Sequence, residues 1–178
     1  GPGSSVTSSG TVQALNGNLS LGAVYTQTGG TLTVAANSSV GGFGGSMLIN
    51  GGTVSGDGTL SGNVTNSATI NPGSTQGVLT VNGNYTQTSS GVLNMEIASA
   101  SSYDILQVSG TATLAGTLNA IGVGVYTPLA ANSYAVLTFT SETGDFATNN
   151  LTVNGVPLIK RYNATSLALS GGGGQGII

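Results

Sequence analysis

Five carboxylic side chains could take part in acid–base chemistry in this chain. They are Asp57, Glu96, Asp104, Glu142 and Asp145. A pair of carboxylates in a groove is the usual apparatus for cleaving a glycosidic bond. No two of these five have a spacing that predicts a shared site. We interpret Glu142 and Asp145 as a polar turn and Asp104 as the cap of a turn, and so predict no catalytic residue and no enzyme.

The sequence also offers few side chains that could bind a metal ion or a cofactor. The sequence has no histidine and no cysteine, which removes the commonest general base and two common metal ligands. The segment 51–58 carries Gly and Asp in an order faintly similar to calcium-binding repeat loops, but those sites need stacked copies to supply enough oxygen ligands. A single copy is better explained as a turn. We predict no metal site and no cofactor.

The charge of the chain excludes one class of partner. Charged residues make up 4% of the sequence, the net charge is −3, and the only basic residues are Lys160 and Arg161. Nucleic-acid binding requires several cations to neutralise phosphates, so we expect no nucleic-acid partner. Lys160 is placed to pair with Asp145 or Glu142. No apolar run is long enough for a membrane span, so no membrane insertion by this chain is expected.

Two tyrosines occupy equivalent places in an internal repeat. Tyr25 opens the run Tyr-Thr-Gln-Thr, and Tyr85 opens the same run later in the chain; each is followed by a small-residue bend and a short alternating strand. Two readings of these rings remain open. They could lie exposed as contact residues for a sugar ligand, or they could close the core of a repeating unit. The repeat itself is typical of a solenoid.

The wider pattern predicts an all-β fold. Strands of four or five residues alternate apolar and polar positions and end at Gly, Asn-Gly or Asn-Pro-Gly, while good helix formers are scarce. The spacing favours a right-handed parallel β-helix with a C-terminal β cap, in which each turn uses roughly 20 residues and stacks at about 4.8 Å. An antiparallel β-sandwich built from Asn-Gly hairpins is the alternative.

Composition also suggests four segments. Residues 1–4 resemble the remnant of a cleaved tag, residues 5–124 form the stacked turns, and residues 171–178 form a Gly-rich tail or linker. Residues 125–170 hold longer apolar stretches and most of the aromatic residues. Because a solenoid must cover its last turn, we assign this segment to a cap. The aromatic side chains expected to fill the cap are Tyr134, Phe139 and Phe146.

An ordered set of short motifs resembles the C-terminal passenger region of bacterial autotransporter proteins of the AIDA and pertactin-like kinds. It includes Gly-Thr-Leu-Ser-Gly-Asn-Val-Thr-Asn at 58–66, Ala-Thr-Ile-Asn-Pro-Gly at 68–73, Tyr-Asp-Ile-Leu-Gln-Val-Ser-Gly at 103–110 and Gly-Asp-Phe at 144–146. The resemblance covers roughly residues 55–170. It implies a right-handed parallel β-helix on the bacterial cell surface, exported across the outer membrane, and a full-length protein that carries a translocating barrel.

From this resemblance we expect a non-enzymatic, surface-exposed structural and adhesive module. It would be the C-terminal stalk and folding seed, similar to an autochaperone, of a secreted β-helix protein. The partners implied are host or bacterial surface glycans or proteins, or a second copy of the chain. The alternative is a carbohydrate-binding or carbohydrate-active β-solenoid, for which Tyr25 and Tyr85 would be the contact residues.

Overall fold

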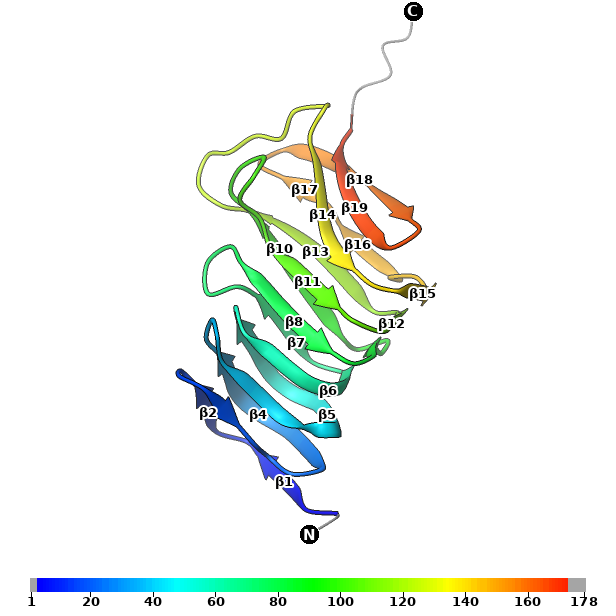
Figure 1. Cartoon of the computed structure of the whole chain (residues 1–178). Helices are drawn as coiled ribbons and strands as arrows, with labels where there is room; N and C mark the ends of the chain where they lie inside the picture. The colour runs from blue at the N-terminus through cyan, green and yellow to red at the C-terminus, as the bar shows by residue number, and fades with distance from the viewer. Residues whose placement is uncertain (1–2, 173–178) are drawn as a thin grey trace, which may run out of the picture.

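A computed structural model describes residues 3–172 of the chain (Figure 1), so most of the Gly-rich tail and the first half of the tag remnant lie outside the described residues. The fold is all-β. Nineteen strands and no helix are assigned within residues 3–172. That part of the chain accordingly has no helix long and apolar enough to cross a membrane.

The strands form where side chains alternate between apolar and polar. In β6 (Thr59–Asn66), for example, Leu60, Val64 and Asn66 are buried, whereas Thr65 on the other face is partly exposed. Successive side chains of a strand point to opposite faces, so this pattern puts one face inside and one in solvent. The chain forms strands rather than helices because Thr, Val and Ser fit a pleated, half-buried surface.

The strands β1 to β16 pair in parallel and build three ladders. The first ladder contains β2 (Thr11–Ala14), the ends of β4 (Val24–Val34) and β5 (Ser39–Gly56), β7 (Thr69–Pro72), β10 (Val92–Ile97), β13 (Thr117–Gly122) and β16 (Thr148–Asn150). The second contains β3 (Asn18–Leu19), the start of β5, the start of β6, β8 (Val78–Asn82), β11 (Ile105–Val108) and β14 (Ser133–Thr138).

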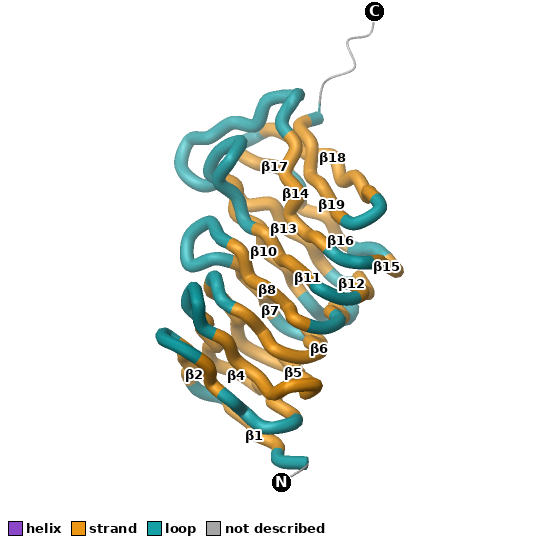
Figure 2. The backbone as a smooth tube through the Cα atoms, in the orientation of Figure 1, coloured by secondary structure: helices purple, strands orange, loops and turns teal. Residues whose placement is uncertain are grey.

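The third ladder joins the remaining parts of the long strands. It contains β1 (Ser5–Ser8), the start of β4, the middle of β5, the end of β6, β9 (Tyr85–Gln87), β12 (Thr111–Leu114) and β15 (Ser141–Gly144). The chain visits the ladders in rotation, so its strands lie layer upon layer from the N-terminal to the C-terminal end (Figure 1). The loops gather along the flanks of this stack (Figure 2).

The core consists of columns of apolar side chains that run across the layers. In the first ladder, the residues in register at one buried position are Leu32, Val54, Ile70, Leu93 and Leu118. All five are fully buried. Burying each such side chain stabilises the folded state by about 1.5–3 kcal/mol, so a column that extends through many layers contributes much of the stability.

The parallel pairing rules out the antiparallel sandwich considered from the sequence. Apart from two isolated bridges, Gly56 with Gly73 and Ile97 with Tyr103, antiparallel pairing in residues 3–172 occurs where β17 (Thr152–Val153), β18 (Val156–Asn163) and β19 (Ser166–Gly171) join one another and β14. The Asn-Gly pairs therefore do not serve to connect the equal arms of a series of hairpins. The turn at Asn154-Gly155 does join β17 to β18 as a hairpin, with both residues at positive φ.

The three aromatic residues expected in the cap are all buried. Tyr134, Phe139 and Phe146 are each less than 5% exposed, and the Tyr134 ring meets the edge of Tyr103 at a centroid distance of 5.3 Å. The parallel ladders extend beyond the boundary expected at residue 124, because β14, β15 and β16 pair in parallel with the preceding layer. Of the antiparallel strands that follow, β19 pairs with β14 of this last layer, and β18 pairs with β19.

Candidate functional site

Tyr25 and Tyr85 do not offer a surface for a ligand. Their side chains are 1% and 0% exposed, so neither ring can act as a platform for a sugar. The prediction of surface contact at these two positions is wrong. The reason lies in the register: both tyrosines occupy inward-facing positions of the third ladder, in register with buried Met47 and Val64. The reading in which they close the core fits this placement.

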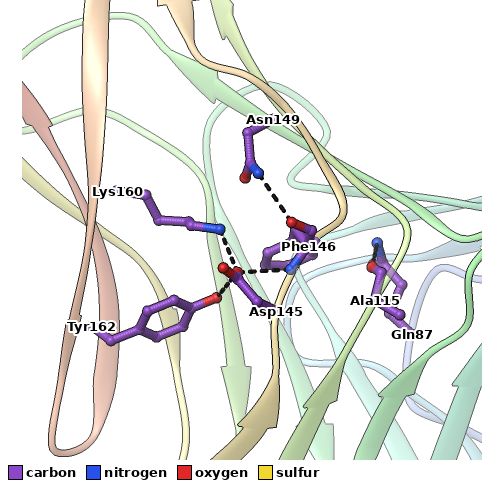
Figure 3. Close-up of polar contacts among 7 residues, drawn as sticks. All are labelled: Gln87, Ala115, Asp145, Phe146, Asn149, Lys160 and Tyr162. Atoms are coloured by element: carbon purple, nitrogen blue, oxygen red, sulfur yellow. Dashed lines mark hydrogen bonds and ion pairs between the residues drawn. The ribbon is translucent and has the colours of Figure 1, made fainter.

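A polar network accompanies the second tyrosine inside the core. The Tyr85 hydroxyl donates to Gln87 Oε1 at 2.7 Å and accepts from Asn66 Nδ2 at 3.2 Å. Gln87 Nε2 in turn lies 3.0–3.1 Å from the carbonyl oxygens of Gly91, Ala115 and Thr117. Ala115 and Gln87 appear together in Figure 3. Since buried polar groups are costly without partners, this network is a structural tie between layers.

The structure gathers three carboxylates that the sequence did not predict to meet. Asp57 Oδ2 accepts from Ser74 Oγ at 2.8 Å, and Glu96 Oε2 accepts from Gln76 Nε2 at 3.0 Å. Asp104 Oδ1 accepts from the backbone N–H of Gly77 at 3.1 Å. The three residues thus surround the loop 73–77. The expectation that no two carboxylates share a site is corrected, because loops of different length bring distant positions to one flank.

Asp104 is the most buried member of this group. Its second oxygen accepts from the backbone N–H of Glu96 at 2.8 Å, so the two oxygens hold one backbone amide of β10 and one of the loop 73–77. This agrees with the turn-capping role predicted from the sequence. Burial is the main cause that raises the pKa of Asp104 to about 7; the two amide bonds oppose the rise, and the charges of Glu96 and Asp57 add to it. In residues 3–172 no three such side chains are arranged to hold a metal ion.

A second polar cluster lies in the cap (Figure 3). Lys160 forms an ion pair with Asp145, as one of the two pairings expected from the sequence, and the Tyr162 hydroxyl and the Phe146 backbone N–H donate to the same carboxylate oxygen. The Lys160 ammonium also lies 5.8 Å from the centre of the Phe146 ring. Partial burial acts to raise the pKa of Asp145, but these donors lower it below the ordinary value. The cluster fixes β18 onto the loop before β16.

A column of asparagines runs along the outer face of the first ladder. Asn94 Nδ2 donates to Asn71 Oδ1 at 2.8 Å, Asn119 Nδ2 donates to Asn94 Oδ1 at 2.7 Å, and Asn150 Nδ2 donates to Asn119 Oδ1 at 2.7 Å. We call Asn71, Asn94, Asn119 and Asn150 the asparagine column. Two hollows, of about 290 and 460 Å³, open beside it, and Ile121 lines both.

The asparagine column was not predicted from the sequence, although the sequence contains a signal for it. Asn71, Asn94 and Asn119 each end a short run of one β-branched and one aliphatic residue: Thr-Ile-Asn, Val-Leu-Asn and Thr-Leu-Asn. Partners in the column are 23, 25 and 31 residues apart. Because the loops between the layers grow towards the C-terminus, a search at one fixed period does not align these runs.

Comparison with known proteins adds no assignment to this geometry. No protein-family model matches the chain. No curated protein matches it either.

Proposed function

We propose that this chain is a non-enzymatic structural and adhesive module with the architecture of a right-handed parallel β-helix. One observation carries the proposal: the strands from β1 to β16 pair in parallel through every layer, and β17 to β19 cover the last layer. Such a stack is elongated and exposes the sides of every layer to solvent. This shape suits a stalk that holds a binding surface away from the point where the protein is attached.

The proposal extends to location and assembly. On the resemblance to autotransporter passengers, we propose that the module lies on the bacterial cell surface, as the C-terminal stalk and folding seed of a secreted protein whose full length carries a translocating barrel. The absence of cysteine from the sequence fits a chain that crosses a second membrane unfolded, where a disulfide would obstruct passage. Surface glycans, surface proteins or a second copy of the chain are the partners proposed.

The folding-seed part is tested by refolding a fragment that spans residues 55–170. This fragment keeps the apolar columns from β6 onward, the network of Tyr85 and Gln87, and the cap. We expect it to regain its β-type circular dichroism spectrum after dilution from denaturant, and to do so at least as fast as the whole chain. A fragment of residues 3–102 is the control of similar size and should refold poorly. An unfolded 55–170 fragment would contradict the folding-seed role.

A carbohydrate-binding solenoid remains the second candidate. The hollows beside the asparagine column favour it, since they lie on the surface and are lined by amide side chains. A carbohydrate-active enzyme receives less support. Asp104, whose pKa is raised by burial, is 1% exposed and has both oxygens engaged by backbone amides, so it is poorly placed to transfer a proton to a substrate.

A further inference from the structure

The outer face of the first ladder carries two hollows that share Ile121 in their lining. The smaller hollow lies between the loop that follows β7 and the outer face of β10, and Asn71, Asn94 and Glu96 contribute to its lining. The larger hollow continues over β13 and β16, where Asn119 and Asn150 line it. Ile121 stands at the junction and is 40% exposed. The two hollows therefore form one track that crosses four neighbouring strands.

The asparagine column gives this track a regular set of hydrogen-bonding groups. All three side-chain bonds run in the same sense, with each amide nitrogen donating to the amide oxygen of the layer before. An amide has two N–H donors and two lone pairs on oxygen, so the column uses only part of its capacity. The mutual bonds hold the amides in fixed orientations. The remaining donors and acceptors are therefore preorganised for a ligand.

The chemistry of the lining selects the kind of ligand. Groups that donate and accept at the same site match hydroxyls, which also do both. None of the residues that line the two hollows is basic, and Glu96 contributes a carboxylate, so an acidic ligand would be repelled. Ile121 supplies an apolar contact for the C–H face of a sugar ring. Adjacent strands lie about 4.8 Å apart, so four strands span about 14 Å, the length of a short chain of sugars.

We propose that the asparagine column binds a neutral, linear oligosaccharide that lies across β7, β10, β13 and β16. The inference rests on the adhesive role proposed above and names its ligand class. A second copy of the chain is the competing occupant, because a row of amides could pair with an equivalent row. The hollows favour the sugar, since a flat copy of the same face would leave them unfilled, and unfilled hollows lose the packing contacts that a stable interface needs.

The test is a titration of the ¹⁵N-labelled chain with neutral hexasaccharides of the β-1,4-glucan, α-1,4-glucan, β-1,4-xylan and β-1,4-N-acetylglucosamine types. A hexasaccharide of galacturonic acid is the acidic comparison. We expect shifts confined to the side-chain amides of the asparagine column and the backbone of Ile121, with at least one neutral ligand and not with the acidic one. Asn94→Val and Asn119→Val should each weaken binding at least about tenfold.

The matched control is Gln107→Ala, which removes an exposed amide from β11 in the second ladder and should leave the affinity unchanged. Circular dichroism checks that all variants fold. No shift with any neutral ligand at about 10 millimolar, ten times a dissociation constant of about 1 millimolar, would overturn the proposal. So would preferential binding of the acidic ligand, an equal loss in the control variant, or concentration-dependent shifts of the column without ligand, which would indicate a second copy. None of these results would affect refolding of the 55–170 fragment, so the two proposals fail separately.

Discussion

Two glutamines show how one residue type can have different energetic roles at equivalent positions. Gln27 and Gln87 belong to the two copies of Tyr-Thr-Gln-Thr, and both are buried. Gln87 uses its oxygen and its nitrogen, whereas in Gln27 the nitrogen donates to the Thr53 carbonyl at 3.2 Å and the buried oxygen has no partner. The interior of the second copy is therefore the better satisfied, and that copy lies within the proposed folding seed.

Replacing each glutamine with methionine should separate these roles. Gln87→Met keeps the side-chain length but removes the acceptor of the Tyr85 hydroxyl proton and the side-chain donor to three carbonyls, so we expect a loss of about 2–4 kcal/mol in the free energy of unfolding. Gln27→Met removes an unpartnered oxygen along with two longer bonds, to the Gly30 and Thr53 carbonyls, and should cost less than about 1 kcal/mol. Urea unfolding followed by circular dichroism measures both. Equal losses would contradict the assignment.

Asp104 predicts an unusual dependence of stability on pH. Its pKa is raised from 3.8 in an exposed state to about 7 in the fold, so between these values the folded chain binds more protons than the unfolded chain. Stability from this group is fully present below about pH 4 and is lost as the pH rises through 7. One pKa unit corresponds to about 1.4 kcal/mol. Thermal unfolding from pH 4 to 8 should show stability falling over this window.

The variant Asp104→Asn tests the source of that slope. It cannot titrate, so the decline between pH 4 and 8 should flatten, even though the variant is less stable at pH 4 because one backbone amide loses its acceptor. Asp145→Asn is the comparison, since the pKa of Asp145 is lowered and its stabilisation is lost only in acid. A slope that persists in Asp104→Asn would assign the effect to another group, with Glu96 and Asp57 the nearest carboxylates.

At the scale of elements, the sequence predicts the strands better than their partners. Alternation within β6 and β10 locates the buried face directly, and the apolar columns follow once parallel stacking is assumed. Which strands pair with one another depends on the lengths of the loops between them, and the alternation of apolar and polar residues within a strand carries no information about loop length. The loop 98–104 and the loop 123–132 lengthen the later layers, and this moves Glu96, Asp104 and the asparagine column into contacts that no fixed period predicts.

The two tyrosine repeats show the same limit for the candidate site. The shared sequence of the two copies correctly predicted that they occupy equivalent places in the fold. The sequence does not show which face of a strand is buried when both faces carry polar residues. Tyr25 and Tyr85 alternate with threonines that are partly exposed. Only the register with Met47 and Val64 places the rings inside.

Where a strand ends at a turn, the backbone can require a residue without a Cβ, and Gly56 is an example. This residue ends β5 with a φ of 120°, and a Cβ added there would collide with the backbone carbonyl of Val34 in the layer beneath. We expect Gly56→Ala to cost more than about 2 kcal/mol, because neither the conformation nor the contact can relax cheaply. Gly10→Ala, with no atom within 4 Å and no positive φ, is the control and should change stability by less than about 0.5 kcal/mol. Chemical unfolding of the Gly56→Ala and Gly10→Ala variants measures both changes in stability.

At the scale of the whole molecule, the two ends of the stack differ in construction. At the C-terminal end, β19 pairs antiparallel with β14 and buries Leu167 and Leu169, while β18 is tied down through Lys160 and Asp145. At the N-terminal end, β1 and β2 each pair along one edge only, with β4, and their side chains are mostly exposed. One end is closed by dedicated strands, and the other presents a layer of the same kind as those within the stack.

This difference predicts opposite tolerance to truncation. Ending the chain after Asn150 removes the cover from Tyr134, Val136 and Leu137, and the burial lost with each large apolar side chain is about 1.5–3 kcal/mol. Summed over the cap, that loss is comparable with the total stability of a small domain, about 5–15 kcal/mol, so we expect an aggregating or unfolded product.

Starting the chain at Ser20 instead removes β1, β2 and β3 and leaves β4 as a new end of the same kind, which should lower the melting temperature by only a few degrees. Thermal circular dichroism and sedimentation velocity compare the two products. Equal damage from both truncations would show that the antiparallel strands do not act as a cap, whereas survival of the N-terminal truncation alone would establish that the fold is secured from its C-terminal end.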